Sequence, residues 1–369
     1  MIQKVKELDT PSLLLDKKKL WTNIEKMSQF ANEHNVKLRP HIKTHKSVEI
    51  AKLQLAYGAT GITTAKIAEA EVMAEAGIRD MLIAYPISSS QKIGRVLGLL
   101  NKGVDLKIAV DSLEQIKLLQ KGLEKSGHRL EVWIKVDSGL NRCGVKPGRS
   151  AAELAQAIVF LSSLTLGGIF THAGHSYGAK NHEEQERIAL QEAEAVLQSA
   201  EACEKAGISI PVRSVGSTPT YRLSGKISGI TEVRPGNAVF FDAIQVGLGV
   251  AGIEECALSV LTSVVGVHED RVVIDAGSKT LCLDKGAHGL DSVKGYGHVV
   301  GHPELIIERL SEEHGVITFS SKPDIKLNDK LLIVPNHACT VANMFDEYIV
   351  IEGEDVVNRW RVDARGMRT

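Results

Sequence analysis

The segment from Gly103 to Leu123, GVDLKIAVDSLEQIKLLQKGL, decides the fold. It opens with a glycine and the apolar run 105–110, and after Ser112 come Leu113, Ile116, Leu119 and Leu123. The apolar run predicts a buried strand, and the spacing of three to four residues predicts a helix with one buried face. Together they predict the strand-then-helix unit of an α/β protein.

The same junction from helix to strand recurs over the first two thirds of the chain. Gly58, Gly77, Gly103 and Gly127 each precede a short apolar run, and glycine can end a helix because it adopts positive φ without steric cost. The candidate parallel strands are residues 36–43, 61–64, 80–85, 105–110, 130–137, 165–172, 211–215 and 231–234. Eight strands alternating with helices favour a closed (β/α)₈ TIM barrel over an open sheet.

After residue 250 the pattern changes to β-branched runs separated by turn residues. These runs are Leu258–Val267, Arg271–Asp275, Gly315–Phe319, Lys330–Val334 and Tyr348–Ile351. They predict a C-terminal β domain that the early strand Ser12–Asp16 joins. We therefore expect a barrel domain of residues 17–250 and a β domain of residues 251–369 with strand 9–16.

Composition excludes several classes of partner. The 369 residues carry 44 lysines and arginines against 45 aspartates and glutamates, a balance that leaves no basic footprint for nucleic acid or an anionic membrane. Five cysteines without a Cys-x-x-Cys pair fit a reducing compartment, and the sequence has neither a leader pattern nor a membrane-spanning apolar run. We expect a cytoplasmic protein with a small-molecule substrate.

The pentapeptide Arg39-Pro40-His41-Ile42-Lys43 ends the first predicted strand. Barrel enzymes build their active sites at this end of the strands, and cationic neighbours can lower the pKa of a lysine so that it reacts with an aldehyde. The alternative is a solvated basic loop. Polar residues at four further strand ends favour the active site: Arg142, His172, the segment 214–218 and Arg234.

Two of these segments predict a phosphate site. Gly216-Ser217-Thr218 is a nest of small residues with backbone N–H groups and hydroxyls, and Gly236 and Asn237 offer two more amides. Alone, such a loop is more often a tight turn. A lysine, a phosphate nest and an inward Arg234 together describe a pyridoxal phosphate site.

His337-Ala338-Cys339 is a candidate metal pair. On an extended segment the side chains at positions i and i+2 point to one side, so an imidazole and a thiolate could share zinc. From spacing alone, a buried histidine near a structural cysteine is the commoner explanation.

Six motifs in order resemble the D-serine dehydratase and D-threonine aldolase family, a branch of the fold-type III, alanine-racemase-like pyridoxal phosphate enzymes. They are RPHIKTHK at 39–46, VDSGLNRCG at 136–144, THAGHSY at 171–177, GSTP at 216–219, EVRPG at 232–236 and PNHAC at 335–339. The resemblance extends from about residue 9 to Gly366 and is closer to the dehydratase-like branch.

The resemblance implies a homodimer of barrel-plus-β-domain chains, with pyridoxal phosphate bound covalently by Lys43. It implies Arg142 and Arg234 near the cofactor ring, Ser217, Thr218, Gly236 and Asn237 at the phosphate, His172 and Tyr177 as catalytic residues, His175 and Tyr177 at the substrate, and His337 and Cys339 at the metal. Dehydratase-like members hold Zn²⁺ with this pair. Aldolase-like members carry an aspartate as second ligand, which favours harder metals such as Mn²⁺, whereas this chain has Cys339.

The activity that the resemblance implies first is zinc-assisted loss of water from a 3-hydroxy-D-amino acid, D-serine before others. Lys43 would take the Cα proton, and the products would be a 2-oxo acid and ammonia.

Three alternatives stay open. A metal-dependent D-threonine or 3-hydroxy-D-aspartate aldolase needs a second base, which the loop 172–177 could supply, but the aldolases' base histidine falls near Gly178. A non-catalytic pyridoxal phosphate protein of this kind would stop at the barrel. A racemase needs a tyrosine base that has no clear match in the C-terminal region.

Overall fold

The computed structural model describes residues 3–286 and 293–369. Two compact units divide the chain, and each is discontinuous in sequence. The barrel unit contains residues 27–43, 50–236 and 366–369. The sheet unit contains the described parts of 1–26, 44–49 and 237–365.

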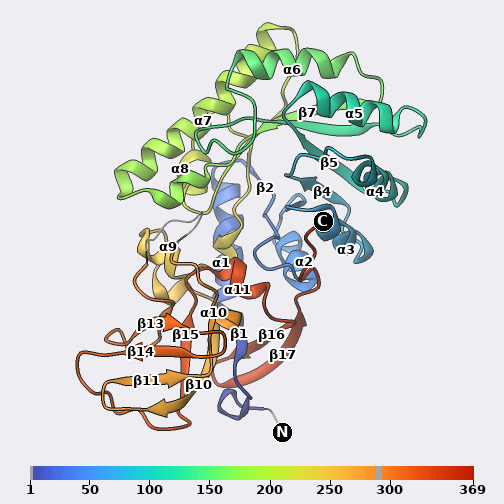
Figure 1. Ribbon diagram of the computed structural model, residues 1–369. Coiled ribbons are helices and arrows are strands. Elements are labelled where there is room, and N and C mark those ends of the chain that lie inside the picture. The colour runs from blue at the N-terminus through green and yellow to red at the C-terminus, as the bar shows by residue number, and fades with distance from the viewer. Residues whose placement is uncertain (1–2, 287–292) are drawn as a thin grey trace. The chain divides into compact units, whose positions relative to one another are not determined.

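The barrel unit is built on eight parallel strands in the order β2-β9-β8-β7-β6-β5-β4-β3 (Figure 1). Their bounds are β2 Lys37–Leu38, β3 Ile62–Thr64, β4 Asp80–Ile83, β5 Asp105–Val110, β6 Leu130–Lys135, β7 Leu164–Phe170, β8 Val212–Val215 and β9 Glu232–Val233. The two ends of this order meet where Thr63 N donates to Pro40 O at 2.8 Å and Ile42 N donates to Thr63 O at 2.9 Å. The barrel is therefore closed, and all eight predicted strands are confirmed.

Helices alternate with these strands. They are α1 Lys17–Glu33, α2 Val48–Ala56, α3 Ile67–Glu75, α4 Ser90–Asn101, α5 Leu113–Leu123, α6 Arg149–Val159, α7 His182–Lys205 and the short α8 Tyr221–Ser224, with the 3₁₀ helix η2 Gly174–Gly178. Gly58, Gly77, Gly103 and Gly127 all have positive φ, as predicted. Among the described helices, none has the length and apolar character needed to cross a membrane.

The helix α5 shows how local sequence sets an element. Ser112 caps it by accepting a hydrogen bond from Gln115 N, and Ile116, Leu119 and Leu123 are buried as predicted. The prediction was wrong for Leu113, which is 45% exposed. At about 100° per residue, Leu113 lies at the edge of the face that the other three form.

A buried ionic group accompanies the apolar core of the barrel unit. Arg39 Nε donates to Glu232 Oε2 at 2.9 Å and pairs with Asp80, which also accepts from Lys107 Nζ at 2.7 Å. The Arg39 guanidinium lies 5.5 Å from the centre of the Trp133 ring. Because each buried charge has an opposite partner, removing one partner would cost more stability than the pair contributes.

The sheet unit has nine strands in the order β11-β14-β13-β12-β15-β10-β1-β16-β17. Its elements are η1 Val5–Glu7, β1 Ser12–Asp16, η3 Asn237–Val239, α9 Ala243–Gly247, η4 Ile253–Glu255, β10 Leu258–Val267, β11 Arg271–Ile274, α10 Ser278–Leu281, β12 His298–Val299, β13 Ile306–Leu310, β14 Gly315–Thr318, β15 Lys330–Val334, α11 Ala338–Ala342, β16 Glu347–Glu352 and β17 Asp355–Arg361. Because β10 also pairs with β11, the first six strands of this order close a ring. This is the predicted C-terminal β domain, a β-barrel that β1 joins.

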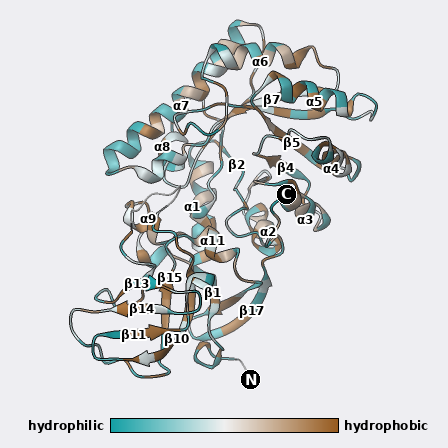
Figure 2. Ribbon diagram, in the orientation of Figure 1, coloured by the Kyte–Doolittle hydropathy of each residue, from teal (hydrophilic) through white to brown (hydrophobic). Residues whose placement is uncertain are grey.

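The sequence patterns predicted six of these strands and missed β12, β13 and β17. The missed strands are two residues long, or carry charged residues at exposed positions. In Figure 2, brown apolar residues follow β10 and β15, whereas α7 alternates between teal and brown. The missed strands lack that continuous apolar signal.

Candidate active site

Lys43 lies just beyond β2, at the carboxyl end of the barrel strands. It is half-buried, and its backbone N–H donates to His41 Nδ1 at 3.3 Å. His41 N in turn donates to Pro235 O at 3.0 Å, so the lysine loop lies beside the loop that follows β9. The hydrogen bonds that close the barrel thus also fix the position of the backbone at Lys43.

Basic side chains from four strand ends, those of β2, β6, β7 and β9, converge around Lys43. Burial lowers the pKa of His41 well below its ordinary value, and Lys43, His172, Arg234 and Lys135 lower it further. Burial likewise lowers the pKa of His172, with Lys43, Arg142 and Lys135 adding to the effect. Both histidines are therefore neutral at pH 7. His172 lies within electrostatic range of Lys43 and Arg142, and His41 lies within range of Lys43 and Arg234.

Arg234 is buried and rigidly held. Its guanidinium donates to Ser214 Oγ and to Thr171 O, and Ser214 Oγ donates to Glu232 Oε1 at 2.7 Å. Burial lowers the pKa of Arg234 to about 10, although Glu232 opposes the shift. The arginine keeps its charge at neutral pH and its orientation is fixed.

The loop after β8 forms the predicted nest. Gly216 has φ +121°, and a Cβ there would lie 3.0 Å from Arg234 N. Ser217 and Thr218 are buried, and Gly236 is half-buried. Small residues, hydroxyls and a buried arginine form a cradle that fits a phosphate monoester, and the nearby Lys43 amine fits an aldehyde.

The loop after β6 carries Arg142. Asp137 Oδ1 accepts from Gly139 N at 3.0 Å and from Asn141 N at 3.1 Å, and Gly144 N donates to Asp111 Oδ2 at 3.0 Å. Arg142 itself is exposed. These hydrogen bonds fold the loop back, and Arg142 lies close enough to His172 to lower its pKa.

The loop after β7 holds His172, His175 and Tyr177. His172 Nδ1 is 3.3 Å from Gly216 O, and Ser176 Oγ is 3.0 Å from Ser217 Oγ, so this loop lies against the phosphate nest. Both ring nitrogens of His175 are shielded from solvent and have no hydrogen-bond partner among the described residues. Tyr177 is half-buried. The structure brings these three predicted residues next to the nest.

The metal pair lies in the sheet unit, and its backbone differs from the prediction. His337 is the extended N-cap of α11, and Cys339 lies in the first turn of that helix, so the predicted extended segment 337–339 was wrong. Asp242 Oδ2 accepts from Ala338 N at 2.9 Å and thereby anchors the helix start.

The two side chains nevertheless face each other. Burial would lower the pKa of His337, but Cys339 and Asp284 raise it well above its ordinary value. Cys339 Sγ is 3.2 Å from Thr44 Oγ1, and Asn237 Nδ2 donates to the sulfur at 3.9 Å. An imidazole beside a thiol with polar partners is a donor set that suits zinc.

This pair would supply only two protein ligands. Over residues 3–286 and 293–369, no group of three or more His, Cys, Asp and Glu side chains is arranged to hold a metal ion. Asp284 Oδ1 lies 3.5 Å from His337 Nδ1 and could orient the imidazole from behind. Thr44 and Asn237, which contact Cys339, directly follow Lys43 and Gly236 in the chain.

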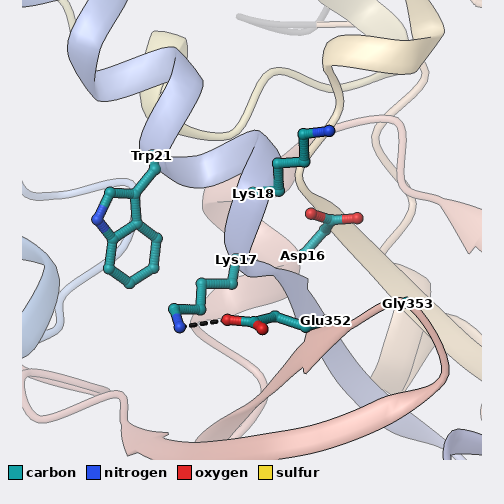
Figure 3. Close-up of a pocket in the computed structure, with 6 residues that line it drawn as sticks. All are labelled: Asp16, Lys17, Lys18, Trp21, Glu352 and Gly353. Atoms are coloured by element: carbon teal, nitrogen blue, oxygen red, sulfur yellow. Dashed lines mark hydrogen bonds and ion pairs between the residues drawn. The ribbon is translucent and has the colours of Figure 1, made fainter.

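A separate surface pocket of about 480 Å³ lies at the start of α1 (Figure 3). It is lined by Asp16, Lys17, Lys18, Trp21, Glu352 and Gly353, and Lys17 pairs with Glu352. A second cavity of about 740 Å³ lies between the ends of α6 and α7, beside Phe160. Neither contains a predicted site residue.

Several polar residues that support the candidate site were not predicted from the sequence. They are Lys135, Glu192, Asp242 and Asp284. Lys135 and Glu192 are charged residues on the buried faces of β6 and α7, which is the signal that could have revealed them.

Comparison with known families agrees with this arrangement. Residues 15–243 match the model described as "Alanine racemase, N-terminal domain", and residues 257–351 match the "Putative serine dehydratase domain".

Curated relatives match the chain over nearly its whole length. A D-threo-3-hydroxyaspartate dehydratase of Delftia sp. is 36% identical over 96% of this chain and 97% of its own. A 3-hydroxy-D-aspartate aldolase of Paracoccus denitrificans is 31% identical over 98% and 93%. A D-serine dehydratase of Dictyostelium discoideum is 28% identical over 97% of each chain.

Solved structures also cover the whole chain. The D-threonine aldolase of Filomicrobium marinum has a TM-score of 0.93 at 29% identity and covers 100% of this chain and 99% of its own. A cysteine-to-alanine mutant of a D-threo-3-hydroxyaspartate dehydratase, in the metal-free form, has a TM-score of 0.91 at 33% identity, covering 97% and 98%. The chain therefore belongs to the fold-type III, alanine-racemase-like family of pyridoxal phosphate enzymes with a serine dehydratase domain, and is a lyase-type enzyme.

Proposed function

We propose that this enzyme eliminates water from a 3-hydroxy-D-amino acid to give a 2-oxo acid and ammonia. Lys43 carries pyridoxal phosphate, and His337 and Cys339 hold Zn²⁺. The enzyme works as a homodimer, and D-serine and D-threo-3-hydroxyaspartate are the substrates to test first.

The observation that carries the proposal is the facing pair His337 and Cys339. A thiolate as second donor favours a borderline-soft ion, and zinc is the Lewis acid that makes a hydroxyl a leaving group. An aspartate in place of Cys339 would have favoured a harder metal. The chain continuity from Lys43 to Thr44, which touches Cys339, supports a role of both clusters in one reaction.

The residues have distinct tasks in this proposal. When bound, pyridoxal phosphate supplies the electron sink for deprotonation at Cα, and zinc supplies the Lewis acid for loss of the β-hydroxyl. Lys43 Nζ takes the Cα proton. Arg234, with a pKa of about 10, does not give up its proton at neutral pH and would therefore hold the ring nitrogen largely unprotonated.

The neighbouring loops bind and orient the cofactor and the substrate. Ser217, Thr218 and the amides of Gly236 and Asn237 hold the phosphate, and Arg142 lies near the ring. His172, His175 and Tyr177 line the substrate pocket. The ring nitrogens of His175, which have no hydrogen-bond partner in the described part of the chain, support its role in substrate binding.

The substrate choice depends on the β-substituent. The sequence motifs favour D-serine, whereas a relative at 36% identity is named for D-threo-3-hydroxyaspartate. A dicarboxylate needs one more cation at the pocket, and the exposed Arg142 is a candidate for that contact.

The decisive experiment is a product analysis. Purified protein with pyridoxal phosphate and zinc receives D-serine, D-threonine or D-threo-3-hydroxyaspartate, and 2-oxo acid, ammonia and glycine are quantified with and without a chelator. Chelator-sensitive release of a 2-oxo acid and ammonia supports the dehydratase and names its substrate. Glycine with an aldehyde would make the enzyme an aldolase, and cofactor binding without any product would indicate a non-catalytic protein.

A further inference from the structure

Glu192 is a carboxylate on the buried face of a helix. It lies in α7, is fully buried, and shares that face with Ile188, Ala189, Ala193 and Val196. A carboxylate at such a position is costly unless hydrogen bonds compensate it. Three hydrogen bonds from neighbouring groups compensate the carboxylate of Glu192.

Glu192 joins the two loops that carry predicted site residues. Its Oε1 accepts from Ala173 N at 3.1 Å and from Gly216 N at 2.9 Å. Ala173 directly follows His172, and Gly216 opens the phosphate nest. One carboxylate oxygen therefore ties the loop after β7 to the loop after β8.

The second carboxylate oxygen of Glu192 is linked by hydrogen bonds, through Thr220, to the hydroxyl of Ser217 in the nest. Glu192 Oε2 accepts from Thr220 Oγ1 at 2.7 Å, and Thr220 Oγ1 lies 2.9 Å from Ser217 Oγ. On the other side, Ser176 Oγ lies 3.0 Å from Ser217 Oγ and donates to Ala173 O at 2.7 Å.

The direction of these hydrogen bonds follows from counting protons. A hydroxyl has one proton, so Thr220 gives its proton to Glu192, and Ser176 gives its proton to Ala173 O. Both hydroxyls next to Ser217 can then only accept. The proton of Ser217 is the one that can turn toward an incoming phosphate oxygen.

We propose that Glu192 is a positioning residue for the cofactor phosphate: it fixes the two loops against each other and leaves the Ser217 hydroxyl as a donor. This inference rests on the proposed binding of pyridoxal phosphate. Glu192 itself touches neither cofactor nor substrate in this role.

The test uses three variants of Glu192 and one matched control. Glu192→Ala removes all three acceptor contacts. Glu192→Gln keeps an oxygen for the two amides, and its NH₂ group can donate to Thr220, which leaves the Ser217 proton available. The control is Ser199→Ala, because Ser199 is a fully buried residue on the same helix whose hydroxyl accepts from Gly148 N at 2.9 Å, outside the site.

The readout is the affinity of the apoenzyme for pyridoxal phosphate and for pyridoxal, measured by absorbance titration. Glu192→Ala should weaken the binding of pyridoxal phosphate about tenfold or more, because it leaves buried N–H groups without acceptors. It should leave the affinity for pyridoxal nearly unchanged. Glu192→Gln and Ser199→Ala should stay within about threefold of the parent for both ligands. Equal weakening of both ligands, or none, would overturn the inference.

Two further measurements keep the result interpretable. If Glu192→Ala fails to fold by circular dichroism, Glu192→Asp takes its place, because the shorter side chain cannot reach both loops and should still weaken pyridoxal phosphate selectively. If the parent protein binds no pyridoxal phosphate, or Lys43→Ala does not alter its absorbance, the proposed function fails rather than the role of Glu192.

Discussion

At the scale of single residues, Lys43 stands among bases whose charges depend on burial. Besides burial, the groups that most lower the pKa of His41 are the basic residues Lys43, His172, Arg234 and Lys135. An anionic cofactor phosphate would be attracted to this basic cluster.

Lys43→Arg tests the role of this amine. A guanidinium keeps the charge but does not form an imine, so the visible absorbance of bound pyridoxal phosphate should vanish and dehydration should fall about 10²- to 10⁴-fold. Lys52→Arg, an exposed lysine on α2, is the control. A normal cofactor spectrum in Lys43→Arg would refute the assignment.

Cys339→Ala tests the metal pair. The variant should lose bound zinc by elemental analysis and lose dehydratase activity, yet keep the absorbance of the cofactor, because Lys43 is untouched. Cys203→Ala is the comparison: burial raises the pKa of Cys203 to about 11, so it is a poor metal ligand at neutral pH. Unchanged zinc content in Cys339→Ala would contradict the proposed site.

At the scale of elements, the loop after β6 depends on glycine geometry. Gly144 has φ +120°, and a Cβ there would lie 2.6 Å from Asp137 N, whereas Gly148 has φ +79° and nothing within 4 Å of that point. Gly144 is therefore required both for its conformation and for the close approach of two backbone segments.

Gly144→Ala should destabilise the protein more than Gly148→Ala does. Both substitutions strain a positive φ, which costs about 1–2 kcal/mol, but only Gly144→Ala adds a clash with backbone atoms. Urea unfolding of the two variants measures the difference. Equal midpoints would show that the loop relaxes freely and does not fix Arg142.

The elements also show the limits of prediction from sequence. Strong alternation of strand and helix gave all eight barrel strands, since long apolar runs bounded by glycine are local signals. The backbone at residues 337–339 was not predictable in this way. Its helix start depends on Asp242, whose carboxylate comes from a segment almost 100 residues earlier.

At the scale of the whole molecule, buried neutral histidines link stability to pH. The pKa values of His41 and His172 lie well below 6.5 in the folded state, so the unfolded chain binds protons first as the pH falls below about 6.5. Stability of the apoprotein should therefore fall with pH in this range, by at most about 1.4 kcal/mol per unit for each histidine.

Urea unfolding between pH 7.5 and 5.5 checks this expectation. Replacing both histidines with glutamine should flatten the dependence relative to the parent, whereas His268→Gln, at an exposed position, should leave it unchanged. The comparison between variants also removes the opposing contributions of His337 and Asp242, whose pKa values are raised in the folded state. An equal slope in parent and double variant would count against buried, neutral histidines.

The candidate site residues that could be predicted were those in short motifs at strand ends. Lys43, His172 and Arg234 follow local apolar runs, so their place at one end of the barrel followed from topology. Glu192 and Asp284 could not be assigned a partner, because the groups that they contact come from distant segments. Long-range pairing is a property of the folded chain.

The first strand of the sheet unit has a consequence for biosynthesis. Leu13, Leu14 and Leu15 of β1 are fully buried between β10 and β16, which the ribosome makes roughly 240 and 330 residues later. At about 5–20 residues per second, this apolar segment waits on the order of 10 to 50 seconds for its first partner. The barrel strands are all made in that interval, so we expect the barrel unit to fold first, while the apolar β1 stays unpaired and open to aggregation.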